Sequence, residues 1–165
     1  MIKSLTFTGI IVFLMAASKL GSQEQAGREK QKSQAEIMLD EAKELRKEDR
    51  LRQAKLTYRD IVELYTDRHV QRQALQAIAE IQEHRQRYLE AQQTYERLYE
   101  KTGETPLGLQ YLYQSARLKE KMGFQNQATE IYRQIVSARP GSTAAQKAKN
   151  RLKLNDLLPL NEAAN

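Results

Sequence analysis

The sequence predicts an all-α protein, a right-handed α-solenoid of three helical hairpins followed by a C-terminal capping helix. Ala54, Ala91 and Ala128 stand 37 residues apart, and a tyrosine follows each of them four residues later. Self-similarity at such a period is typical of repeat architectures. From residue 33 onward, apolar residues recur three or four positions apart, as on one face of an amphipathic helix. Because no segment alternates apolar and polar residues, we expect no strand.

The first three helices are bounded by caps and polar breaks. Ser33 is a suitable N-cap for a helix that ends at the polar break over residues 48–50. A second helix follows this break and continues to Tyr65. Asp67 can then cap a third helix, which ends at the basic turn over residues 84–87.

Glycine and proline bound the remaining helices. The fourth helix follows the turn and ends at Gly103, and the Thr-Pro pair at 105–106 starts the fifth. Proline suits this place because the first helical residue needs no N–H donor. The fifth helix ends near Gly123, the sixth ends at residues 140–141, and Ser142 caps the last helix.

The residues that recur at this period predict the core. The two helices of a hairpin approach most closely where both carry small side chains. The pairs at these positions are Ala42 with Ala54, Ala79 with Ala91, and Ala116 with Ala128. The tyrosines Tyr58, Tyr95 and Tyr132 are expected to project into the junction with the next hairpin, with each hydroxyl at the wet edge. Gln92, the neighbour of Ala91, is expected to face solvent.

The second helices resemble the tetratricopeptide repeat (TPR) family. The segments LRQAKLTYRDIVELY, YLEAQQTYERLYEK and FQNQATEIYRQIVSARP share its alanine–x3–tyrosine pattern, and the resemblance covers residues 35–155. The stretch ATEIYRQIVSARPGSTAAQKAKNRL is similar to repeat ends in bacterial periplasmic proteins of the Tol–Pal and outer-membrane-assembly systems. The chain departs from the family in its longer period, its lack of tryptophan and its single helix-ending proline, Pro140. The resemblance implies a scaffold that binds another protein in a concave groove.

The family's groove positions fall on the first helix of each hairpin. Carried over residue by residue, they are Leu39, Lys43, Lys47, Gln73, Gln76, Glu80, His84, Gln110, Tyr113, Arg117 and Lys121. The carboxylate clamp of chaperone-binding members needs Lys and Asn where this chain has Leu39 and Lys43, so we expect no capture of a C-terminal carboxylate. Tyr113 and Arg117 suit an aromatic or acidic anchor of a partner peptide. We expect this pair to face Gln76 and Glu80.

The N-terminus has the pattern of an export signal. Lys3 precedes an apolar run over 5–17 that ends in small residues, and the run is shorter than the roughly 20 residues of a spanning helix. We expect an exported protein of the periplasm or cell envelope, cleaved after residue 16, 17 or 18, and a retained anchor stays open. The domains are 1–18 (signal peptide or short membrane anchor), 19–32 (polar linker), 33–155 (TPR-like helical repeats) and 156–165 (C-terminal tail).

Composition further narrows the range of functions that the sequence allows. The chain has no cysteine, and its two histidines, His69 and His84, have no second ligand at helical spacing, so we expect no disulfide and no metal site. The carboxylates alternate with Lys and Arg as on solvated helix faces, and no phosphate-binding loop or Ser–His pair is visible. We therefore expect no catalytic residue, no cofactor and no enzymatic activity.

These observations favour an exported adaptor that binds a protein of the cell envelope through its groove, as a monomer or a weak oligomer. The alternative is a membrane-tethered scaffold whose basic C-terminal end contacts lipid or an anionic envelope polymer. That end carries six cations with no acid among them, Arg133, Arg139, Lys147, Lys149, Arg151 and Lys153. Nucleic acid is not an expected partner, because export would separate the protein from it.

Overall fold

The computed structural model describes Gly27, Lys30 and residues 34–157, with side chains up to residue 153. The predicted signal segment, most of the linker, the N-cap Ser33 and the chain after residue 157 lie outside the described residues. The first described helix covers residues 34–47. It is followed by α2 (Leu51–Leu64), α3 (Arg68–His84), α4 (Tyr88–Thr102), α5 (Pro106–Lys121), α6 (Gln125–Ala138) and α7 (Thr143–Leu157).

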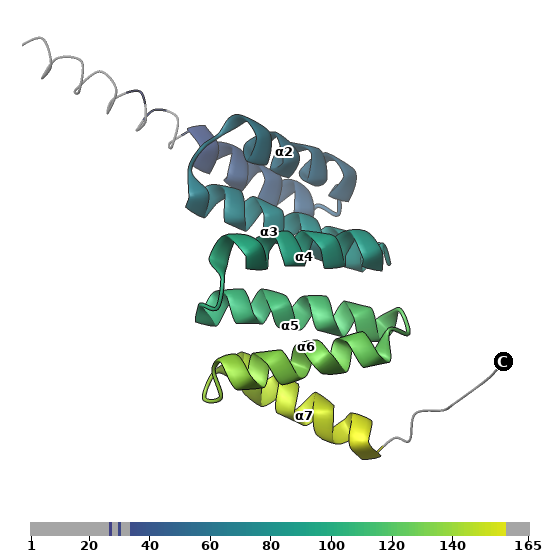
Figure 1. The fold of residues 1–165 in the computed structure, drawn as a ribbon. Coiled ribbons are helices and arrows are strands. Elements are labelled where there is room, and N and C mark those ends of the chain that lie inside the picture. The colour runs from purple at the N-terminus through teal and green to yellow at the C-terminus, as the bar shows by residue number, and fades with distance from the viewer. Residues whose placement is uncertain (1–26, 28–29, 31–33, 158–165) are drawn as a thin grey trace, which may run out of the picture.

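The helices stack in chain order, and the two ends of the described chain lie at opposite ends of the stack (Figure 1). From α2 onward each helix packs against its neighbours in the sequence, and α7 also packs against α5. No strand occurs in the described residues, so the predicted all-α solenoid is confirmed. Within the same range, no helix combines the length and the hydropathy that crossing a membrane requires.

The side chains predicted as N-caps make the expected hydrogen bonds. Asp67 accepts from two backbone N–H groups in the first turn of α3, at 2.8 and 3.0 Å. Thr105 accepts from the N–H three residues later at 3.0 Å, and Ser142 does the same at 3.1 Å. These bonds pair donors that the start of a helix leaves without an intrahelical acceptor.

The three hairpin turns share one backbone geometry. Asp49, Gln86 and Gly123 have φ values of 59°, 60° and 88°, and they stand 37 residues apart. In each turn the following residue donates its N–H to a carbonyl five residues earlier, at 2.9 Å in all three. This is the helix-ending motif in which a left-handed residue is usually glycine, and two of the three positions here are not glycine.

The buried side chains form three clusters, each at the junction between one hairpin and the next helix. Tyr58 packs with residues of the 34–47 helix and α3, Tyr95 with residues of α3 and α5, and Tyr132 with residues of α5 and α7. All six alanines of the predicted pairs are fully buried, each pair within one cluster. The Tyr132 hydroxyl donates to Glu120 at 2.9 Å. The predicted core positions are therefore confirmed.

The prediction that Gln92 faces solvent is wrong. Its side chain is only 3% exposed, and its Nε2 donates to the Ser115 hydroxyl of α5 at 3.4 Å. Ser115, fully buried itself, donates in turn to Glu96 at 3.2 Å. The reason is that α4 is packed against both α3 and α5, so a helix in the middle of the stack has two buried faces.

Candidate functional site

A cleft of about 230 Å³ lies between the 34–47 helix and α3, on the side formed by the first helices of the hairpins. Five of the predicted groove residues line it, and three further residues complete it. The lining is Leu39, Lys43, Arg46, Tyr58, Gln73, Gln76, Ala77 and Glu80. The structure thus brings together five of the predicted groove residues of the first two hairpins, while their role in binding stays a prediction.

The cleft has an apolar floor and a polar rim. Leu39, Tyr58 and Ala77 are buried and form the floor. On the rim, Arg46 donates to Glu80 at 2.6 Å, and Gln76 donates to the other carboxylate oxygen of Glu80 at 3.0 Å. Burial raises the pKa of the Tyr58 hydroxyl, which is also hydrogen-bonded to Arg46, so this phenol stays neutral.

A second hollow of about 190 Å³ extends the cleft towards the hairpin turn. It shares Arg46 and Glu80 with the first and reaches the predicted groove residue His84. Together the two hollows follow the seam between two first helices, as a groove for an extended segment would. The predicted positions Lys47 and Gln110 are exposed and line neither hollow.

The expected contact of Arg117 with Glu80 is wrong. Arg117 is paired with Glu83 of α3, and one guanidinium nitrogen lies 2.7 and 2.5 Å from the two carboxylate oxygens. Lys121 adds a bond to the same carboxylate at 3.1 Å. The Arg117 and Glu83 side chains are 24% and 18% exposed. Arg117 thus joins α3 to α5, and its charge is already neutralised.

The pKa of Glu83 reflects this pairing. Burial acts to raise the pKa of the carboxyl, but the hydrogen bonds and charges of Arg117 and Lys121 outweigh it and hold the pKa below its usual value. Glu83 is therefore ionised at neutral pH. The group serves as a fixed anionic bridge between two hairpins.

Tyr113 also lies elsewhere than expected. It is half-buried and packs against Tyr132, with ring centroids 5.7 Å apart, and Lys147 of α7 lies 5.9 Å from its ring centroid. The tyrosine that reaches Gln76 is Tyr111, whose hydroxyl donates to the Gln76 carbonyl oxygen at 3.0 Å. The reason is that α5 packs against α7, which covers the Tyr113 side of the helix.

Sequence reasoning missed Arg46 and the ion pair that it forms. Arg46 with Glu80, and Glu83 with Arg117, are the same contact in successive repeats, because 46 and 83, like 80 and 117, stand 37 residues apart. The charges are reversed between the two pairs. Opposite charges at equivalent repeat positions were visible in the sequence and could have indicated this bridge.

The described residues contain no group of three or more His, Cys, Asp or Glu side chains that could hold a metal ion. Every buried polar side-chain atom in this part of the chain has a hydrogen-bond partner. The cleft offers shape and hydrogen-bonding groups.

Comparisons with known proteins identify the fold alone. No protein-family model matches the chain, and no curated protein matches it. Among solved structures, the chain is similar to the C-terminal TPR-containing domain of a Plasmodium falciparum protein described as an FK506-binding protein. The TM-score is 0.54 at 15% sequence identity, over 79% of this chain and 96% of that domain. The architecture is thus a TPR-like helical repeat.

Proposed function

We propose that this protein is a non-enzymatic adaptor, a monomer or weak oligomer, that binds an extended segment of another protein in the cleft between the 34–47 helix and α3. The TPR-like fold supports this function, because stacked helical hairpins expose long surfaces suited to binding other chains. The observation that carries the proposal is the lining of the cleft, an apolar floor with a rim of amides and charges.

The size and chemistry of the cleft favour a peptide over a small molecule. Its volume of about 230 Å³ is below the range of roughly 300–1,000 Å³ that ligand pockets usually have, and suits one or two side chains. The Gln73 and Gln76 amides can both donate and accept, as the backbone of an extended segment requires. An apolar side chain of the partner would lie on Leu39 and Ala77.

The location outside the cytoplasm is part of the proposal. Its support is the export pattern of the first 18 residues, together with the likeness of the last repeat to Tol–Pal and outer-membrane-assembly proteins. The partner would then be a component of the cell envelope. N-terminal sequencing of the protein recovered from cells tests this, and intact Met1 in the soluble cytosol would contradict it.

A photo-crosslinking residue placed in the groove tests the adaptor function. Substitution at Gln73 should capture the partner in intact cells, whereas the same residue at the exposed Gln93, on the second helix of its hairpin, should not. Purified partner should bind the Lys43→Gln, Gln73→Ala variant at least about tenfold more weakly. The Arg52→Gln, Gln93→Ala variant, with both residues exposed on second helices, is the matched control. Equal capture at both positions would contradict binding in the cleft.

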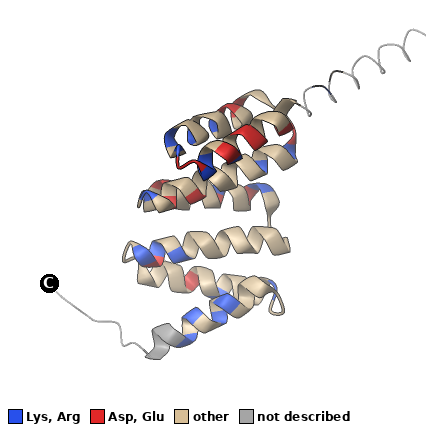
Figure 2. Ribbon diagram, turned by 180° about the vertical axis from the view of Figure 1, so that it is seen from behind, with Lys and Arg blue, Asp and Glu red and all other residues tan. Residues whose placement is uncertain are grey.

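The basic C-terminal end supports a second candidate, contact with lipid or an anionic polymer. Figure 2 shows cationic bands and no acidic one on α7 up to residue 153. Lys147, Lys149 and Lys153 are exposed. Binding through this end should weaken steeply with salt, whereas binding in the cleft should weaken less. If replacing the three lysines with Gln abolishes partner capture, the basic end is the working surface.

A further inference from the structure

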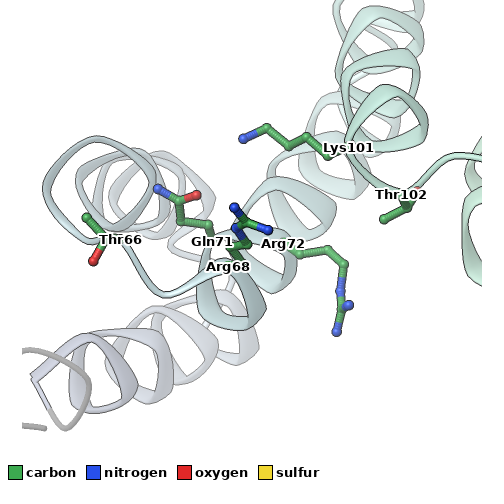
Figure 3. A pocket seen from close by; sticks show the side chains of 6 residues that line it. All are labelled: Thr66, Arg68, Gln71, Arg72, Lys101 and Thr102. Atoms are coloured by element: carbon green, nitrogen blue, oxygen red, sulfur yellow. The ribbon is translucent and has the colours of Figure 1, made fainter. Parts of the chain in front are cut away.

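A separate pocket of about 670 Å³ lies where the chain passes from α2 to α3, beside the end of α4. It is lined by Thr66, Arg68, Gln71, Arg72, Lys101 and Thr102 (Figure 3). None of these residues lines the concave cleft. Figure 3 shows Lys101 extending from α4 towards the side on which Arg68 and Gln71 project from α3.

The described lining of this pocket is cationic. Three of its six described residues are cations, and none of these six is an acid. Among the described ion pairs, none involves Arg68, Arg72 or Lys101, although most of the cations on the first hairpin are paired. Arg72 donates to the His69 ring at 2.8 Å and interacts electrostatically with Tyr111. Like charges gathered without a counter-charge oppose folding, so they are not explained by stability.

The position of the two arginines strengthens this argument. Arg68 is the first residue of α3 and Arg72 follows one turn later, with no acid in the first turn. The N-terminal end of a helix carries the positive end of its dipole, where anions are favoured and cations are not. The Asp67 carboxylate already caps this end of α3. It is therefore the pocket cations, and not the helix dipole, that favour a negative group in the pocket.

Hydrogen bonds within the protein hold part of the pocket wall. Gln71 donates from Nε2 to the carbonyls of Val62 and Tyr65, at 3.1 and 2.6 Å, which holds the α2–α3 connection against α3. Thr102 donates to the Leu98 carbonyl at 2.7 Å. Arg68 and Lys101 are exposed, so binding an anion would order these two side chains at a cost in conformational entropy.

We infer that this pocket binds a phosphate ester with a polar, non-aromatic body. Guanidinium and ammonium groups are the usual ligands of phosphate oxygens, and a site with three cations suits a group that carries more than one negative charge. The volume lies within the range of small-molecule sites, so the ligand is larger than a bare ion. The lining contains no aromatic ring on which a base could stack. A soluble phosphoester and a phospholipid headgroup share this chemistry.

Calorimetric titration of the full chain with glycerol 1-phosphate tests the site. Wild type should bind it, and the Arg68→Gln, Lys101→Gln variant should show a dissociation constant at least tenfold higher. The Arg52→Gln, Arg97→Gln variant loses the same charge from exposed positions of α2 and α4 and should bind within twofold of wild type. Absence of binding to wild type, or equal weakening in both variants, would overturn the proposal.

Two further measurements complete the test. Vesicles of phosphatidic acid, whose headgroup is also a phosphomonoester, should compete with glycerol 1-phosphate for wild type if the natural ligand is a lipid headgroup, and should fail to compete if it is a soluble ester. Vesicles of phosphatidylcholine are the control for membrane binding through the apolar N-terminal segment. Without ligand, the pocket variant should melt at the same or a higher temperature than wild type, because charge repulsion is relieved. A lower melting temperature would assign the cations to stability and overturn the proposal.

Discussion

The bridge between Glu83 and Arg117 should contribute measurably to stability. We predict that Arg117→Gln lowers the free energy of unfolding by about 2 kcal/mol. Breaking a buried ion pair costs about 3–5 kcal/mol, whereas an exposed pair contributes at most about 1 kcal/mol. The two side chains are 24% and 18% exposed, which places them between these limits. Lys121, which lies 3.1 Å from the Glu83 carboxylate, can still pair with it in the variant. The loss of stability should therefore stay below the cost of breaking a fully buried ion pair.

Urea unfolding of a double-mutant cycle measures this pair. Glu83→Gln, Arg117→Gln and the double variant should give a coupling energy of at least about 1 kcal/mol. Lys43 is the matched control, because it stands at the same repeat position in the first hairpin and pairs only with the exposed Asp40. Lys43→Gln should change stability little. A coupling energy within about 0.3 kcal/mol of zero would refute the structural role of the bridge.

Three other predictions concern the fold. The pKa of Glu83 is lower in the folded chain than its ordinary value of about 4.3. The stability that this carboxylate contributes is therefore complete above the ordinary pKa and is lost as the pH falls through the folded-state pKa. Glu83→Gln should therefore flatten the acid limb of a stability–pH curve, and an unchanged limb would contradict the pairing. Gln86→Gly should stabilise by about 0.5–1 kcal/mol in urea melts, since its φ is 60°, and a loss of stability would contradict strain there. Gly108→Ala should destabilise the protein by about 3 kcal/mol, because a Cβ would lie 1.9 Å from the Gly103 carbonyl oxygen. An unchanged midpoint of urea unfolding would show that the turn shifts to accommodate the methyl group.

The sequence was sufficient to predict three helix caps and the repeated core positions. Asp67, Thr105 and Ser142 cap their helices as expected, because a cap is a contact within three residues. The buried alanines and tyrosines follow from the 37-residue period, since each repeat solves the same packing problem. Sequence alone therefore fixes helix starts and the core register.

The sequence was insufficient where a second helix determines the environment of a side chain. Gln92 is polar and was expected in water, but α5 covers it and supplies a hydrogen-bond partner. Arg117 was expected in an open groove, but its length lets it reach a carboxylate 34 residues earlier in the chain. Such contacts depend on the angle and distance between helices, and no periodicity in one helix reports these.

The reversed polarity of the two inter-repeat ion pairs has a consequence for how this gene could change in length. Excision of one 37-residue unit after Arg46 would bring Arg117 to the place of Glu80 and set two cations against each other. Duplication of the middle unit would set Glu83 of one copy against Glu80 of the next. Either product of unequal recombination would carry a like-charge contact at its new junction. A change in the number of hairpins would therefore have an electrostatic cost as well as a packing cost.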